Sequence, residues 1–196
     1  DTMNCTIRQI SRGGVVTTLA GSAGSGGTND GTGSAARFWY PAGVAVDRAG
    51  NVYVADQLSH TIRQITSGGA VSTLAGSAGN PGTNEGTGSA AQFCYPVSVA
   101  AGPGGNVYVA DYYNHTIRRI ASGGVVTTLA GLAGTSGTNN ASFLVMSRAD
   151  CAGSDVTVTW PSVVGKQYRI AFRPKPRSDA YEAIASRAAA ESMPVN

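Results

Sequence analysis

A pentapeptide that recurs every 55 residues constrains the fold more than any other feature of the sequence. Thr6–Ile10 reads Thr-Ile-Arg-Gln-Ile, Thr61–Ile65 repeats it letter for letter, and Thr116–Ile120 differs by a single Arg. Each copy is followed by a Gly-Gly turn and a run rich in Val, Ser and Thr that ends in Leu-Ala-Gly. A fixed period of this length is typical of repeat proteins, in which neighbouring units bury each other's apolar faces.

Each complete unit contains four candidate strands, which in the first such unit are residues 43–47, 51–56, 61–65 and 70–75. Val, Tyr, Ile and Thr fill these runs, as half-buried strands prefer. The Gly and Asn residues between the runs tolerate the positive φ of tight turns. No amphipathic segment of ten or more residues separates the runs, which argues against crossover helices. The sequence therefore predicts an all-β fold of propeller blades, each with four antiparallel strands.

Two longer motifs point to a family. Residues 51–56 and 106–111 both read Asn-Val-Tyr-Val-Ala-Asp, and each is followed by a His-Thr-Ile-Arg tetrapeptide. With these motifs the chain resembles the NHL-repeat family of β-propellers over residues 3–143, although Thr stands where the family name has Leu. The resemblance implies a fold and leaves the function open, because scaffolds, sensor domains and a minority of enzymes share it.

The period stops after Phe143, which divides the chain into a repeat domain, residues 1–143, and a C-terminal domain, residues 144–196. Two and a half units cannot close a ring of four to eight blades, so exposed strand edges and blade faces need a cover. Three alternatives would provide this cover: a second copy of the chain in a homo-oligomer, further blades if the chain is an excerpt of a longer protein, or residues 144–196. We favour the homo-oligomer because blade faces are mutually complementary.

The C-terminal domain carries a different pattern. Residues 155–161 and 167–172 alternate apolar and polar side chains around a Gly-Lys turn, which predicts a β-hairpin. The segment resembles the sandwich-type modules that end some secreted bacterial proteins. Ser178 is a helix-capping residue type, and the Ala-rich stretch 179–191 that follows it predicts a short helix.

Charge and hydropathy exclude two classes of partner. The net charge is only +3 and no basic cluster is present, so we expect no nucleic-acid partner. No run of 18 apolar residues is found, so we expect no membrane span. With the family resemblance, these features suggest an extracellular or cell-surface bacterial protein.

Recurring side chains within the units have structural and chemical interpretations. Arg8, Arg63 and Arg118 recur in register on the third strand, and we expect their stems to cover apolar surface while the guanidinium groups bond outward. Phe38 and Phe93 recur one unit apart, and we expect both rings to lie between blades.

Titratable residues support an enzymatic alternative. His60 and His115 hold equivalent positions, and so do Asp56 and Asp111 at the ends of second strands, while Asp47 ends a first strand. Turn hydrogen bonds explain most such residues. If several units converge on an axis, however, these side chains are candidate ligands for Ca²⁺ or Zn²⁺. The chain would then be a metal-dependent hydrolase or lyase that cleaves a lactone or an ester.

Long polar linkers support the leading hypothesis. Residues 22–37 and 77–92 join the units and are much longer than ordinary connections, a property common in binding loops. We therefore interpret the chain as a binding module of a secreted or surface bacterial protein, with a protein or a glycan as its ligand. A purely structural role is the third alternative. The candidate ligand-binding residues are Asn29, Asp30, Asn84, Glu85, Asn139 and Asn140.

Overall fold

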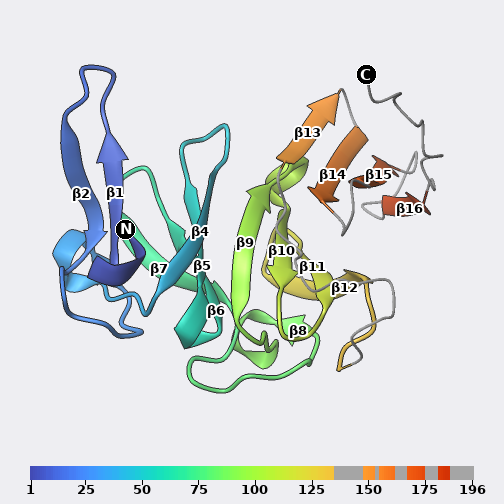
Figure 1. Cartoon of the computed structure of the whole chain (residues 1–196), viewed down its shortest axis with the longest axis horizontal. Coiled ribbons are helices and arrows are strands. Elements are labelled where there is room, and N and C mark those ends of the chain that lie inside the picture. The colour runs from blue at the N-terminus through green and yellow to red at the C-terminus, as the bar shows by residue number, and fades with distance from the viewer. Residues whose placement is uncertain (135–147, 153–154, 162–166, 175–180, 186–196) are drawn as a thin grey trace, which may run out of the picture.

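The structure is a computed structural model that describes residues 1–134 and, beyond them, the strands formed by residues 148–152, 155–161, 167–174 and 181–185. These residues form four antiparallel sheets (Figure 1). Among the described residues, helical geometry is confined to short 3-10 turns. The turns are η1 (Thr2–Asn4), η2 (Gly33–Ala35), η3 (Gln57–Ser59), η4 (Gly88–Ala90) and η5 (Pro103–Gly105).

The N-terminal half-unit, residues 1–21, forms a two-stranded sheet of β1 (Thr6–Ile10) and β2 (Val16–Gly21). These strands correspond to the third and fourth strands of a complete unit. The pairing slips by one residue between Ile7 and Arg8, and the same bulge recurs in both complete units. A bulge of this kind increases the local twist. The half-unit therefore already has the backbone shape of the outer half of a blade.

Two complete blades follow the half-unit, and each has five strands where the sequence predicts four. The additional strand comes from the linker that precedes each blade, and it pairs with the outermost strand of that blade. The linkers are therefore partly strands and not plain loops. The first blade consists of β3 (Gly31–Thr32), β4 (Pro41–Val46), β5 (Val52–Asp56), β6 (Thr61–Ile65) and β7 (Ala70–Ala75). The second consists of β8 (Gly86–Thr87), β9 (Pro96–Ala101), β10 (Val107–Asp111), β11 (Thr116–Ile120) and β12 (Val125–Ala130).

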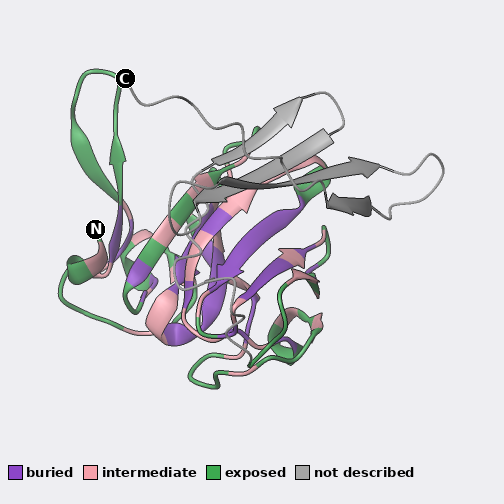
Figure 2. Cartoon of the chain, turned by 45° about the vertical axis from the view of Figure 1, so that its right-hand side comes forward, coloured by how far each residue is buried: buried purple, intermediate pink, exposed green. Residues whose placement is uncertain are grey.

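The core lies between neighbouring sheets, as a propeller requires. Phe93, which directly follows the second linker, packs with one face of the first blade, including Tyr53 and Ile62, and with the facing side of the second blade, including Val109. A matching cluster joins the half-unit to the first blade around Phe38. Both Phe rings are fully buried between sheets, which confirms their expected place. Burial therefore follows the blade-to-blade seams (Figure 2).

The C-terminal strands form a separate antiparallel sheet. Its members are β13 (Arg148–Ala152), β14 (Asp155–Pro161), β15 (Gln167–Pro174) and β16 (Tyr181–Ala185). β14 pairs with β15 in an antiparallel register and overlaps the two runs of the expected hairpin. The hairpin itself stays a prediction, because residues 162–166 lie outside the described residues. The predicted helix is wrong over residues 181–185, because these residues pair with β15 as a strand and strand pairing outweighs the helix propensity of Ala. The other residues of that prediction lie outside the described residues.

Candidate binding face

A buried arginine organises each blade and the linker before it. Arg63 on β6 is fully buried, and its Nη1 atom lies 3.3 Å from Oδ2 of Asp56. Nη1 also donates to the carbonyl of Arg37 (2.9 Å), and Nη2 donates to the carbonyl of Asn29 (3.1 Å) and to Oδ1 of Asp30 (2.6 Å). The guanidinium carbon lies 5.3 Å from the ring centroid of Phe38. The expectation that this guanidinium bonds outward is therefore wrong, because the linker and Asp56 supply its partners inside the protein.

The second blade repeats the arrangement with one change. Arg118 is equally buried, pairs with Asp111 at 3.3 Å and donates to the carbonyls of Asn84 (3.0 Å) and Gln92 (3.2 Å). Glu85 corresponds to Asp30 but accepts a hydrogen bond from the backbone N–H of Thr128 at 2.6 Å. Both linkers are therefore held in place by a buried cation. In the half-unit the equivalent Arg8 is exposed and lies 3.8 Å from Asp1.

The two buried carboxylates, of Asp56 and Asp111, accept hydrogen bonds from several protein groups. Oδ1 of Asp56 accepts the backbone N–H of Trp39, and Oδ1 of Asp111 accepts that of Cys94, each at 2.7 Å. Burial raises the pKa of Asp56, and it raises the pKa of Asp111 to about 6 despite the hydrogen bonds and the neighbouring Arg118. Neither carboxylate faces solvent. Within the part of the chain that the structure describes, no three His, Cys, Asp or Glu side chains gather closely enough to hold a metal ion.

The two histidines end equivalent turns in the left-handed conformation, with φ of 60° at His60 and 57° at His115. Nδ1 of His60 accepts the backbone N–H of Tyr95 from the following unit at 3.2 Å, so this side chain links the two blades. Burial lowers the pKa of His60, which favours the neutral imidazole needed to accept this bond. Cys5 has the same conformation at the equivalent position of the half-unit.

Four of the six candidate ligand-binding residues lie on the described linkers. Asn29, Asp30, Asn84 and Glu85 are all exposed, although their backbone carbonyls or carboxylates also hold the linkers in place. The linkers run against the turns between second and third strands, because Gly24 N–H donates to Asn4 and Gly79 N–H donates to Ser59. Asn139 and Asn140 lie outside the described residues.

Exposed aromatic side chains gather at the same end of the blades, where β4 and β9 begin. Trp39 is 49% exposed and Tyr113 is 58% exposed, and Tyr40 is also exposed. The rings of Tyr95 and Tyr113 pack with centroids 4.8 Å apart. Tyr40 and Tyr95 have positive φ, which is uncommon for bulky residues and clusters at functional sites. We call this end of the blades, together with the linkers, the aromatic face. Two sequence features indicate it: the pair of aromatic residues before Pro41 and the Tyr-Tyr pair after Asp111.

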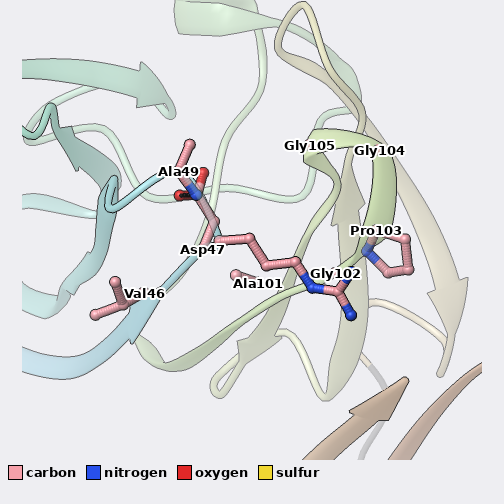
Figure 3. Close-up of a pocket in the computed structure, with 9 residues that line it drawn as sticks. Val46, Asp47, Ala49, Ala101, Gly102, Pro103, Gly104 and Gly105 are labelled. Atoms are coloured by element: carbon pink, nitrogen blue, oxygen red, sulfur yellow. Dashed lines mark hydrogen bonds between the residues drawn. The ribbon is translucent and has the colours of Figure 1, made fainter. Parts of the chain in front are cut away.

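A shallow groove of about 350 Å³ lies at the opposite end, between the turn that follows β4 and the turn that follows β9 (Figure 3). Asp47 lines it, but its carboxylate accepts hydrogen bonds from Asn51, from the backbone of Ala49 and from the Tyr53 hydroxyl. Burial alone would raise the pKa of Asp47. The hydrogen bonds outweigh this effect, so the pKa of Asp47 lies below its usual value. In the second blade Gly102 replaces Asp47, and a Cβ there would lie 2.6 Å from the Tyr108 ring. The metal candidates Asp47, Asp56 and Asp111 are therefore separate side chains with protein partners.

The sequence profile of the NHL repeat matches residues 38–65 and 93–120. Each match begins at the buried Phe that directly follows a linker and ends with the third strand of the blade. These two units are NHL repeats. A plant protein with related sequence, SUPPRESSOR OF QUENCHING 1 of Arabidopsis thaliana, is 35% identical over 95 residues, which cover 48% of this chain and 9% of that protein.

Solved structures resemble the NHL units. A Bacteroides thetaiotaomicron protein of unknown function is 28% identical with a TM-score of 0.53, and the match covers 64% of this chain and 30% of that one. An auxiliary nutrient-binding protein from Bacteroides ovatus is 25% identical with a TM-score of 0.51, over 66% of this chain and 34% of that one. A virginiamycin B lyase from Staphylococcus aureus is 13% identical with a TM-score of 0.52, over 96% of this chain and 51% of that one, which shows the shared fold alone.

The chain thus spans about a third of each of the two Bacteroides proteins and less than a tenth of the plant protein. The hydrolase or lyase alternative, with Ca²⁺ or Zn²⁺, stays a prediction. Within the described residues, no helix has the length and apolar character needed to cross a membrane.

Proposed function

We propose that the chain is a repeat-built binding module and that its ligand, a glycan, binds at the aromatic face. The observation that carries the proposal is the exposure of Trp39 and Tyr113 at the end where both long linkers lie. Flat apolar rings with a polar rim offer stacking surface to sugar rings, and Asn29 and Asn84 add exposed amides that bond to hydroxyl groups.

Two further points support a binding role. Arg63 and Arg118 hold the linker backbone at Asn29 and Asn84, so the segments that carry these amides are positioned before a ligand arrives, which lowers the entropy cost of binding. A Bacteroides ovatus protein that shares the fold and 25% of the aligned residues is described as an auxiliary nutrient-binding protein. We also propose that this module acts outside the cell or at its surface.

An array of plant and microbial oligosaccharides, probed with the labelled full-length chain, tests the proposal. We expect binding to a subset of glycans, unchanged by a chelator. Trp39→Ala and Tyr113→Ala should each weaken it at least tenfold with only a small change in the thermal unfolding temperature, because both side chains are about half exposed. Val125→Ala, an exposed apolar residue on β12, is the matched control and should bind as the wild type does. Glycan binding that survives both aromatic substitutions would contradict the proposal, and binding to a peptide array alone would favour a protein ligand.

Self-association remains a prediction. Sedimentation of the chain over a range of concentrations measures it directly. A mass that stays at 19.8 kDa at all concentrations would contradict the predicted homo-oligomer.

A further inference from the structure

Equivalent tyrosines of the two blades lie close together at the aromatic face. Tyr40 directly precedes β4, and Tyr95 directly precedes β9. These two strands pack closely near the positions where they begin, because a Cβ at Gly43 on β4 would lie 2.7 Å from the carbonyl oxygen of Val97 on β9 (Figure 1). The aromatic residues of the first blade therefore lie near those of the second.

A backbone hydrogen bond joins two further residues at this end of each blade. The N–H of Leu58 donates to the carbonyl of Trp39 at 3.0 Å, and in the second blade the N–H of Tyr113 donates to the carbonyl of Cys94 at 3.0 Å. One member of each pair is an exposed aromatic residue, Trp39 before the first blade and Tyr113 on a turn of the second. Each blade therefore presents one exposed ring beside its tyrosine.

The turn between β5 and β6 connects the two exposed rings. Leu58 of this turn is bonded to Trp39, and His60 at its end accepts the backbone N–H of Tyr95 at 3.2 Å. Leu58 and His60 are two residues apart, so their Cα atoms are separated by at most about 7 Å. The ring of Tyr95 in turn packs on that of Tyr113, with centroids 4.8 Å apart. We call the resulting row the inter-blade strip; its side chains, in order, are Trp39, Leu58, Tyr95 and Tyr113.

The chemistry of the inter-blade strip favours one class of glycan. Its four side chains are all of uncharged types, so an uncharged ligand fits them. Sugars joined by equatorial β-linkages form an extended ribbon, whose apolar ring faces stack on successive flat side chains. We propose that the ligand is an extended, uncharged, β-linked sugar chain that lies along the strip and contacts Trp39 and Tyr113 at the same time. This inference rests on the proposed glycan site and adds the shape, charge and length of its ligand.

Contact with both blades makes the affinity depend on the length of the sugar chain. A disaccharide occupies one end of the inter-blade strip, whereas a longer chain reaches both ends. Once one end is bound, binding at the other end is intramolecular, so it adds affinity without a second loss of translational freedom. A site that recognised single sugars or chain ends would gain nothing from added length.

A length series of β-1,4-linked glucose oligomers tests the inference. Cellobiose, cellotetraose and cellohexaose are each titrated into the full-length chain in a calorimeter. We expect one cellohexaose to bind per chain, with an affinity at least about tenfold higher than that of cellobiose. Trp39→Ala and Tyr113→Ala alter opposite ends of the inter-blade strip, and each should remove most of the gain from length. Leu58→Ser lies between the ends and should weaken cellohexaose binding more than cellobiose binding.

Controls separate this inference from the proposed function. Val125→Ala, an exposed residue outside the inter-blade strip, should keep the length dependence of the wild type, and thermal unfolding shows that each variant is folded. The inference is overturned if cellohexaose binds no more tightly than cellobiose, or if Trp39→Ala and Tyr113→Ala weaken all lengths by the same factor. Binding of other glycans on the array through Trp39 and Tyr113 would then still support the proposed function. The absence of any glycan binding would overturn both.

Discussion

Arg63 and Asp56 form an ion pair in which both side chains are fully buried, with Nη1 and Oδ2 3.3 Å apart. Replacing Arg63 with Met leaves the Asp56 carboxylate buried without its cation and removes the bonds that hold residues 29 to 37. Because an uncompensated buried charge is costly, we expect Arg63→Met to lower the free energy of unfolding by about 3–5 kcal/mol. Urea denaturation measures the change.

Arg8→Met is the matched control, since Arg8 is the equivalent residue in the half-unit and is exposed beside Asp1. We expect a change below about 1 kcal/mol, as for most surface ion pairs. Removing both buried partners, in Arg63→Met with Asp56→Leu, should cost less than Arg63→Met alone. If Arg63→Met were no more harmful than Arg8→Met, the buried pair would not be what anchors the linker.

Gly76 follows β7 at a φ of 104°, and a Cβ there would lie 2.5 Å from the carbonyl oxygen of His60. Gly76→Ala therefore combines a left-handed backbone with a backbone clash, and we expect it to destabilise the chain by more than about 2 kcal/mol. Gly79→Ala has a similar positive φ but no atom within 4 Å, so it should cost about 1 kcal/mol. Thermal unfolding of both variants checks the difference; equal losses would mean that backbone strain alone matters.

Burial raises the pKa of Asp111 to about 6, above its unfolded value of 3.8. The folded state therefore keeps a proton that the unfolded chain releases between these pH values. The contribution of this carboxyl to stability is complete below the unfolded pKa and is lost as the pH rises through about 6. Relative to Asp111→Asn, the wild type should thus gain about 1 kcal/mol on going from pH 7 to pH 5.

Urea unfolding of the wild type and Asp111→Asn at both pH values measures this gain. Comparing the two proteins at each pH cancels the contribution of His60, whose pKa is lowered by burial and whose protonation destabilises the fold in the same range. A substitution that is more harmful at pH 7 than at pH 5 would show that Arg118 keeps Asp111 ionised at low pH.

His60→Ala removes the acceptor of the Tyr95 N–H and places a residue with a Cβ and no polar group in the left-handed region. We expect a loss of about 1–3 kcal/mol from the unpaired N–H and the strain. Asn tolerates this conformation and can accept a hydrogen bond, so His60→Asn should be milder. Thermal unfolding checks the order, and an equally harmful His60→Asn would point to the imidazole ring packing on Tyr95.

The strands of the repeats could be predicted from the sequence because period, alternation and turn residues agree there. Residues 61–65 and 70–75 were expected as strands and form β6 and β7. The linker strands β3 and β8 were not predicted, because two residues carry no periodic signal and their partners lie about 40 residues further along the sequence.

Side-chain partners were harder to predict than strands. Arg63, Asp56 and Phe38 recur with Arg118, Asp111 and Phe93 at one offset, and this joint recurrence is a signal for a buried cation site. The sequence alone does not show which side chains are buried, however, and an arginine is usually exposed. The aromatic face was missed for a similar reason, since Trp39 and Tyr113 are distant in sequence and lie at the same end of the blades only because of the blade geometry.

Each linker contributes its short strand to the outer rim of the blade that comes after it. In a 55-residue module of linker and blade, the linker therefore covers the start of the outermost strand. Adding or removing a whole module leaves the pairing of every outermost strand unchanged. Propellers with different numbers of blades can therefore form from copies of the same repeat.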